Sequence, residues 1–346
     1  MPSLGEKTYR EIYGQTRSFA ALLDTLPDIA AILTQVFSTE YDQLIFTGCG
    51  TSFYLAQTAA HVFNLYNSTP AWAVRCSEMY DTPSAYIKGA RTLVLPITRK
   101  SYTTEVRRAM DLVRAMPGVT SLSITCDGDS ALYNNHVVLC PETPEDSVIM
   151  TRSFTSMVLM AEIISLFAAG RHQDIEGLKS LPALSEAAIP AMDQLAARIV
   201  SEKPSLNLFI TLGQGMMYGI ANESMNKMKE MSLSNSEAYY SLEYRHGPMS
   251  LVDENTLIML FTLPETRDSD TLLLRELEGY GGVSVAMGPH PEAVGGAYTL
   301  PLGTDPLTCA VLGSIFGQMI GYHLAQKKGL NSDTPRHLSQ AIVLKS

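Results

Sequence analysis

The chain has 346 residues, of which 46% are hydrophobic and 17% are charged, and its formal net charge is -10 at pH 7. This length and apolar content suffice for two domains, each with a hydrophobic core. The negative charge excludes a general affinity for nucleic acid, although it leaves room for a small basic pocket that binds one phosphate.

The cysteines and the apolar segments indicate the cellular setting. Five cysteines are widely spaced without a C-x-x-C pair, as is typical of a reducing compartment and of a protein without structural zinc: Cys49, Cys76, Cys126, Cys140 and Cys309. The apolar segments 154–169 and 309–325 are interrupted by residues such as Glu162 and His323, which favours core helices over membrane spans. Because no signal peptide and no histidine cluster with metal-ligand spacing is recognisable, we predict a cytoplasmic protein without a metal, a cofactor or a membrane partner.

Strand and helix patterns alternate along the first half of the chain. A helical segment, 7–36, precedes strands that are expected at 44–46, 71–75, 92–97, 119–125 and 136–139. Helices are expected at 53–65 and 104–116. This alternation predicts a parallel sheet that helices cover on both faces.

The second half of the chain repeats the first. The segment 44–56, LIFTGCGTSFYLA, aligns with 208–221, LFITLGQGMMYGIA, when one insertion is allowed. Two further pairs of segments align in the same way: 92–98 with 256–262, and 118–124 with 282–287. We therefore predict an internal duplication of one strand–loop–helix module, with loops at the carboxyl ends of parallel strands, where such sheets bind ligands.

Three regions are expected along the chain. Residues 1–190 would hold the N-terminal helices and the first module, and residues 191–330 would hold the second. Helices in the segment 170–204 would join the two modules. After the second module, residues 331–346 break the pattern and are expected to form a tail that closes over the site.

Two loops of the first half have the composition of a phosphate site. Residues 48–52, GCGTS, offer backbone N–H groups and two hydroxyls at a helix start, where the helix dipole favours an anion. The loop 98–104, TRKSYTT, follows a later strand and carries hydroxyls and two cations. We expect both loops to meet at one sheet edge and to bind a small anion through Cys49, Gly50, Thr51, Ser52, Thr98, Arg99, Lys100, Ser101 and Thr103. A nucleophilic role for the cysteine is disfavoured, since no histidine is close in sequence to activate it.

A predicted helix in the second half carries three charged residues on one face. Glu223, Lys227 and Glu230 are four and then three residues apart. Such a row of charges often lies on a solvated surface of a helix. Here the flanking positions are apolar, which indicates a buried helix. These positions are Ile220, Met225, Met228 and Met231. Burial would raise the pKa of Glu230 and Lys227 would lower it, a balance that suits a base working near neutral pH.

These motifs resemble the SIS (sugar isomerase) domain family, and specifically the isomerase half of glutamine:fructose-6-phosphate amidotransferases. A further motif is the segment EYRHGP at 243–248, which places His246 directly before a Gly-Pro turn, where loops position catalytic residues. The resemblance covers nearly the whole chain, including REIYGQ, GCGTS, the segment 145–156, ESMNKMKE and PRHLS. It implies an α/β fold of two tandem SIS modules, each a parallel sheet flanked by helices in a flavodoxin-like three-layer sandwich.

The resemblance also implies a role for each motif. Glu230 matches the family's general base, which moves a proton between C1 and C2 of the open-chain sugar. Lys227 and Glu223 match the residues that hold this base and its water. His246 matches the histidine that assists ring opening, which implies a homodimer in which each subunit supplies this histidine to its neighbour's site. The loops 48–52 and 98–103 match the two sugar-phosphate loops.

Three departures from the family pattern bear on the reaction. The sequence lacks a glutamine-hydrolysing domain, so no glutaminase activity is expected. The second phosphate loop usually reads S-x-S-G-E-T but here reads TRKSYT, so Lys100 is either a solvated residue or, as we favour, a cation aimed at the substrate. Gln340 stands where the amidotransferases have an essential lysine, and a glutamine cannot form a Schiff base. Amino transfer into fructose 6-phosphate is therefore not expected.

We predict a sugar-phosphate isomerase or deaminase that acts on an amino-sugar or fructosamine 6-phosphate through an enolamine. One alternative is specifically a fructosamine-6-phosphate deglycase, because Arg99 and Lys100 would suit a substrate with a carboxylate beyond its phosphate. A second alternative, from a different class, is a non-catalytic sugar-phosphate sensor. Such regulators usually carry a DNA-binding domain and do not need the pair of Glu230 and His246.

Overall fold

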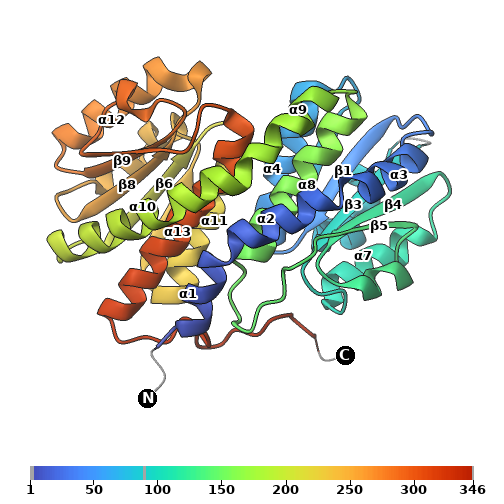
Figure 1. The fold of residues 1–346 in the computed structure, drawn as a ribbon, viewed down its shortest axis with the longest axis horizontal. Helices are drawn as coiled ribbons and strands as arrows, with labels where there is room; N and C mark the ends of the chain where they lie inside the picture. The colour runs from blue at the N-terminus through green and yellow to red at the C-terminus, as the bar shows by residue number, and fades with distance from the viewer. Residues whose placement is uncertain (1–3, 89–90, 345–346) are drawn as a thin grey trace. The chain divides into compact units, whose positions relative to one another are not determined.

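The computed structural model describes residues 4–88 and 91–344, and these residues divide into two compact units (Figure 1). The first-sheet unit comprises Arg17–Glu145, Arg152–Ser180 and Ser339–Ser346. The second-sheet unit comprises Met1–Thr16, Asp146–Thr151 and Leu181–Leu338. This division differs from the expected boundary at residue 190, because the first helix and the long helix that begins at Leu181 pack against the last helix of the second-sheet unit.

The first-sheet unit contains five parallel strands in the order β2-β1-β3-β4-β5. Their bounds are Gln43–Gly48 (β1), Ala71–Arg75 (β2), Thr92–Thr98 (β3), Val119–Thr125 (β4) and His136–Leu139 (β5). All five were expected from the sequence, and the strand order is that of flavodoxin-like sheets.

Helices cover both faces of this first sheet. On one face lie α4 (Thr51–Tyr66) and α8 (Arg152–Ala168), where Phe63 of α4 contacts Phe46 of β1. On the other face Ile45 of β1 joins a core cluster with α5 (Cys76–Asp81) and α7 (Thr104–Arg114). The remaining α-helices described in this part of the chain are α2 (Gln15–Asp24), α3 (Leu26–Val36), α6 (Pro83–Tyr86) and α9 (His172–Gly177).

The second-sheet unit repeats this arrangement with the strand order β10-β9-β8-β6-β7. Its strands are Leu208–Gly213 (β6), Asn235–Tyr239 (β7), Thr256–Phe261 (β8), Val283–Gly288 (β9) and Tyr298–Pro301 (β10). Read from its other edge, the second sheet has the order β7-β6-β8-β9-β10. This strand order is the same as that of the first sheet when β6–β10 are matched with β1–β5, which confirms the predicted duplication.

Helices also cover both faces of the second sheet (Figure 1). On one face lie α11 (Met217–Ser232) and α13 (Pro306–Lys327), which pack against each other. On the other face α12 (Arg267–Gly279) contributes leucines to a core cluster with β8. Two further helices, α1 (Glu6–Tyr13) and α10 (Leu181–Glu202), pack on α13.

Matching glycines shape the first turn of each module. Gly50 and Gly215 have φ angles of 54° and 55°, in the left-handed region that favours glycine. A Cβ atom at Gly48 would lie 2.7 Å from the backbone of Ser52, and one at Gly213 would lie 2.5 Å from the carbonyl oxygen of Met217. These closely packed turns are therefore equivalent parts of the duplicated module.

Only one helix in the described ranges is by itself long and apolar enough to cross a membrane. This helix is α13, and 89% of its most apolar window is buried inside the protein. The bent pair of α2 and α3 would pass the same test only if it formed one span across a 60° bend. Both predicted core helices, α8 and α13, are lined with buried residues along most of their length.

Candidate functional site

The first predicted phosphate loop lies at the carboxyl end of β1 and leads into α4. Gly50 is the N-terminal cap residue of this 16-residue helix, and no side chain forms a capping hydrogen bond there. Thr51 and Ser52 are buried, whereas Cys49 is half-buried and Gly50 is exposed. The backbone of this helix start is therefore oriented to favour an anion.

The second predicted phosphate loop follows β3, the neighbour of β1, so the two loops lie at the carboxyl ends of adjacent strands. Its Ser101 donates from its backbone N–H and its hydroxyl to one carboxylate oxygen of Asp127, at 2.9 and 2.8 Å. The hydroxyls of Thr98 and Thr103 both donate to the carbonyl oxygen of Lys100. The loop is thus held by its own hydrogen bonds, with Asp127 as an internal anion.

Asp127 had no predicted role, although it follows β4 at the same sheet edge. Burial acts to raise the pKa of its carboxyl group, but the hydrogen bonds from Ser101 outweigh burial and hold this pKa below its usual value. The charge on Lys100 acts in the same direction. Asp127 is therefore a carboxylate at neutral pH.

Arg99 is engaged inside the first-sheet unit. Its guanidinium lies 2.8 Å from a carboxylate oxygen of Glu145, and the side chains are only 8% and 1% exposed. Glu145 also accepts hydrogen bonds from the backbone and hydroxyl of Ser153, in the first turn of α8. Because Glu145 compensates the charge of Arg99, the guanidinium of Arg99 is less suited to bind an anionic group of a substrate.

The segment around Gln340 lies against this ion pair. The backbone carbonyl of Gln340 accepts a hydrogen bond from Arg99 at 2.9 Å, and its side-chain amide donates to the carbonyl oxygen of Glu145 at 2.9 Å. Further along, the carbonyl oxygen of Ile342 accepts from the backbone N–H of Thr104. The described part of the predicted tail therefore contacts the second loop, while its last two residues lie outside the described ranges.

A cavity of about 250 Å³ opens beside the second loop, at the carboxyl ends of β3, β4 and β5. Its lining includes Arg99, Lys100, Cys126, Cys140 and Glu145. Lys100 is half-buried, and no ion pair of its ammonium group is found within residues 4–88 and 91–344. Of the two predicted cations, Lys100 is thus the one better placed to meet an anion.

The predicted charged row on α11 forms a buried ion triad. The ammonium nitrogen of Lys227 lies 3.1 Å from a carboxylate oxygen of Glu223 and 2.5 Å from one of Glu230. The side chains of Lys227 and Glu223 are 0% exposed, whereas Glu230 is 24% exposed. The apolar positions predicted to flank the row are buried, so Glu230 is the one member of the triad that solvent or a ligand can reach.

Close packing against α13 fixes the position of this helix. A Cβ atom at Gly317 of α13 would lie 2.5 Å from the Cβ atom of Ser224, and one at Gly321 would lie 3.0 Å from the carbonyl oxygen of Lys227. Only glycine fits at this contact without displacing α11. The backbone that carries the triad is therefore held rigidly from one side.

His246 lies in the second-sheet unit, in the turn before Gly247, and is exposed. The turn is anchored by Tyr244, which is fully buried in the core, and by an ion pair between Arg245 and Glu276. Within the described residues, no hydrogen bond or ion pair joins His246 to Glu230. The predicted loop residues and Gln340 all lie in the first-sheet unit, whereas the triad and His246 lie in the second-sheet unit.

The loop after β8 corresponds by duplication to the second phosphate loop, and a carboxylate fills it. Asp270 is fully buried and accepts hydrogen bonds from the hydroxyls of Thr262 and Thr266, at 2.8 and 2.5 Å. Burial raises the pKa of Asp270 from 3.8 to about 6, although both hydroxyls act to lower it. Each module therefore holds an internal carboxylate against this loop, Asp127 in the first and Asp270 in the second.

Asp270→Asn should stabilise the protein at pH 7.5 and have little effect at pH 4. A carboxyl whose pKa is raised by folding destabilises the native state above that pKa, and the penalty disappears as the pH falls from about 6 towards 4. The expected gain is about 1 to 2 kcal/mol at pH 7.5, measured by urea unfolding. Asp268→Asn, at an exposed position of the same helix turn, is the matched control. An equal gain at both pH values would contradict this account.

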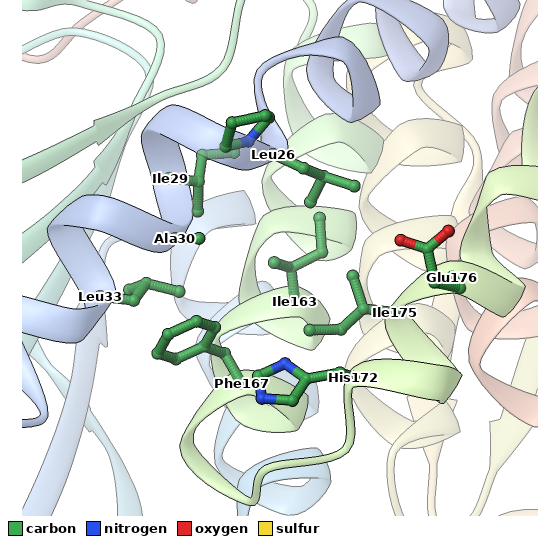
Figure 2. A pocket seen from close by; sticks show the side chains of 10 residues that line it. Leu26, Ile29, Ala30, Leu33, Ile163, Phe167, His172, Ile175 and Glu176 are labelled. Atoms are coloured by element: carbon green, nitrogen blue, oxygen red, sulfur yellow. The ribbon is translucent and has the colours of Figure 1, made fainter.

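A second cavity, of about 260 Å³, lies between α3, α8 and α9 (Figure 2). Aliphatic side chains from all three helices point into it, and His172 packs edge-on against Phe167. None of the predicted site residues lines this cavity. In the described part of the chain, no group of three or more His, Cys, Asp or Glu residues is arranged to hold a metal ion.

The sequence matches a model of a known protein family. The SIS domain profile matches residues 39–169 and 207–288, which is more than half of the chain and includes β1–β5 and β6–β9. The chain belongs to the SIS domain family. The two matched segments correspond to the two modules of the duplication, so this is a protein with two SIS modules.

Individual relatives agree with this membership. The chain is 25% identical to a glutamine–fructose-6-phosphate aminotransferase of Gloeobacter violaceus over 99% of its own length and 60% of that protein's length. It thus spans about 60% of the curated relative. Among solved structures, a glucosamine-6-phosphate deaminase from Thermotoga maritima is 26% identical, with a TM-score of 0.82 over 98% of this chain and 100% of that one. A tagatose-6-phosphate ketose/aldose isomerase from Escherichia coli has the same fold, with 21% identity and a TM-score of 0.84 over 100% and 99% of the two chains.

Proposed function

We propose that this SIS protein is an enzyme that moves a proton between C1 and C2 of an amino-sugar or fructosamine 6-phosphate and thereby isomerises or deaminates it. The observation that carries the proposal is the ion triad on α11, in which two members are fully buried and only Glu230 is partly exposed. Burying charged side chains costs free energy. A buried triad in which one carboxylate remains exposed is therefore more typical of a catalytic base than of a purely structural ion pair. The names of two relatives, an aminotransferase and a glucosamine-6-phosphate deaminase, support a substrate of this class.

In the proposed reaction, Glu230 takes the proton from one carbon of the open-chain substrate and returns it to the neighbouring carbon. Lys227 holds the carboxylate of Glu230 in place through the 2.5 Å contact, and the buried Glu223 contacts the same ammonium group at 3.1 Å. The phosphate would be bound by the loop at the start of α4 and by the second loop, and Lys100 would meet a further anionic group of the substrate, such as a carboxylate. His246 would assist ring opening in the neighbouring subunit of a homodimer, and sedimentation analysis should accordingly find a dimer.

Proton NMR in heavy water tests this function directly. The purified protein is incubated with fructose 6-phosphate, glucosamine 6-phosphate, galactosamine 6-phosphate and fructose–amino acid 6-phosphates in turn. Exchange of deuterium into C1 or C2 is expected for at least one substrate, because general-base chemistry exchanges these protons even when no net product accumulates. Binding without exchange for every substrate would instead favour a sugar-phosphate sensor.

A more specific form of the proposal is a fructosamine-6-phosphate deglycase. Substitution of Lys100 distinguishes a deglycase from an enzyme that acts on amino-sugar phosphates. We expect Lys100→Ala to raise KM at least about 10-fold for fructose–amino acid 6-phosphates, because a charge-assisted hydrogen bond to the substrate carboxylate is lost. The KM for glucosamine 6-phosphate should change less. Arg108→Ala, which removes an exposed charge from the neighbouring helix α7, is the matched control. An equal effect of Lys100→Ala on both substrate types would remove the reason to prefer a deglycase.

A further inference from the structure

Cys49 and Cys76 stand next to each other at the carboxyl edge of the first sheet. Strands β1 and β2 are parallel neighbours, and their last registered residues are Gly48 and Arg75. Each cysteine comes one residue after this pair, so the two cysteines continue the ladder by one step. Cys49 packs against the core cluster that contains Cys76, and the hydroxyl of Thr47 donates to the sulfur of Cys76 at 3.4 Å.

Cys126 and Cys140 repeat this arrangement on the other side of the same sheet. Strands β4 and β5 are parallel neighbours that end with the registered residues Thr125 and Leu139. Again each cysteine comes one residue after the pair, the backbone N–H of Cys140 donates to the carbonyl oxygen of Thr125 at 2.8 Å, and both cysteines line the same cavity. Four of the five cysteines thus form two registered pairs at the edge that carries both phosphate loops.

The strand register brings the two cysteines of each pair close together, although Cys76 is already the first residue of α5. Neighbouring strands are about 4.8 Å apart, which lies within the range of about 4.4 to 6.8 Å between the Cα atoms of disulfide-bonded cysteines. Registered residues of parallel strands also point to the same side of the sheet. In each pair one thiol is half-buried and the other is buried: Cys49 and Cys126 are half-buried, whereas Cys76 and Cys140 are buried. A small oxidant can therefore react first with the half-buried thiol, and the buried thiol can then resolve the mixed disulfide. All five cysteines are free thiols in the structure.

We propose that Cys49–Cys76 and Cys126–Cys140 are two reversible disulfide sites that make the phosphate-binding edge of this protein responsive to oxidation. The oxidant is a small-molecule disulfide such as oxidised glutathione. The thiolate of Cys49 attacks one glutathione sulfur, which forms a mixed disulfide and releases one glutathione. The thiolate of Cys76 then attacks the sulfur of Cys49 and releases the second glutathione. Two protein thiols are thereby oxidised to one disulfide, and oxidised glutathione is reduced to two molecules of glutathione.

The chemistry of the first pair favours the second step. The neighbouring thiol lowers the pKa of Cys76 although burial acts to raise it, so this thiolate is available as the resolving nucleophile. The neighbouring thiol and burial raise the pKa of Cys49, so the first attack is the slower step. In the second pair the thiolate of the half-buried Cys126 attacks oxidised glutathione first, and Cys140, whose pKa burial raises well above its ordinary value, resolves the mixed disulfide more slowly. Cys126 lines the cavity beside Arg99 and Lys100, through which a small oxidant can approach.

Oxidation of the first pair would change the first phosphate loop, a consequence that rests on the proposed function. Cys49 lies inside that loop, directly before Gly50 and the start of α4. A disulfide to Cys76 would tie the loop to the first residue of α5 and remove the thiol as a hydrogen-bond donor. We expect the oxidised protein to bind fructose 6-phosphate on the order of 10-fold more weakly, as for the loss of one hydrogen bond to a charged group.

Peptide mapping tests the disulfides independently of any activity. The full chain is equilibrated in glutathione buffers of increasing oxidised fraction, its remaining thiols are alkylated, and the peptides are identified by mass spectrometry. We expect the cross-linked peptides Cys49–Cys76 and Cys126–Cys140, with the lone buried Cys309 alkylated after unfolding as the internal control. Cys76→Ser should abolish the first cross-link and keep the second. Free or only glutathione-capped thiols at Cys49 and Cys126 in fully oxidised glutathione would overturn the proposal, as would other pairings.

Calorimetric titration with fructose 6-phosphate tests the consequence for binding. The wild type should bind more weakly after oxidation and recover with dithiothreitol, whereas the double variant Cys49→Ser/Cys76→Ser, which lacks both thiols of the first pair, should have the same affinity before and after oxidation. Equal affinity of the oxidised and reduced wild type would overturn the effect on the loop. If no substrate shows proton exchange, the proposed reaction fails, but the peptide map still decides the disulfides.

Discussion

Glu230→Gln is expected to abolish exchange of the C1 and C2 protons and to leave sugar-phosphate binding nearly unchanged. The amide of glutamine occupies the same space as the carboxylate but cannot accept a proton at neutral pH. General-base catalysis by a positioned side chain contributes about 100- to 10,000-fold, so the rate of exchange should fall by at least that range. The measurement is deuterium incorporation by NMR, with binding followed in parallel by calorimetry.

A matched control separates the chemistry from a change in charge. Glu254→Gln removes a carboxylate at an exposed turn of the same unit and should retain full exchange activity. If Glu230→Gln retained more than about a tenth of the exchange rate, another group would have to be the base. If it abolished binding as well, its role would be structural, and the proposed assignment would be wrong.

Lys227→Met should be the most destabilising single change on α11. It leaves the fully buried Glu223 without its cation, and an uncompensated buried charge costs about 3 to 5 kcal/mol. The melting temperature should fall by about 10 °C. The double variant Glu223→Gln/Lys227→Met should recover most of this loss, because it removes both buried charges together. Lys229→Met, at an exposed position of the same helix, should change the stability by less than about 0.5 kcal/mol.

The pH dependence gives a second measurement of the same triad. Burial acts to lower the pKa of Lys227, but the carboxylates of Glu223 and Glu230 outweigh burial and raise the pKa above 10.5. A cation whose pKa is raised by folding stabilises the native state fully below its unfolded value, and this contribution is lost as the pH rises through the folded value. The difference in stability between the wild type and Lys227→Met should therefore be constant from pH 7 to pH 9 and shrink in more alkaline solution. A constant difference at pH 11 would contradict the ion triad.

The pattern of the sequence sufficed for strands with an apolar run and not for edge strands that lack one. The central strands β1, β3 and β4 are buried along most of their length and could be recognised from their apolar residues. Strands β7 and β10 were missed, because NSEAY and YTLP are partly exposed at the edges of their sheet and show no apolar run. The duplication contained the missing signal, since β7 is the counterpart of Ala71–Arg75, which was predicted.

The site could be predicted where its residues are close in sequence. The triad on α11 depends on helical spacing alone, so its contacts followed from positions three and four residues apart. The partners of the second loop could not be predicted in this way. Arg99 pairs with Glu145, and Ser101 with Asp127, through contacts that depend on the order of the strands. The paired cysteines required the register of two strands as well, which the spacing of the cysteines does not reveal.

The division of the chain into interleaved segments has a consequence for protein engineering. The polypeptide passes from one unit to the other five times, so neither unit corresponds to a continuous stretch of the gene. A fragment ending at residue 180 would lack Ser339 to Leu344 of the first-sheet unit and would carry the first helix of the other unit without its packing partner α13. After a cut between residues 180 and 181, each fragment would still hold segments of both units, so nicked protein should remain associated. Expressing a single module will therefore require a redesigned order of segments instead of a simple truncation.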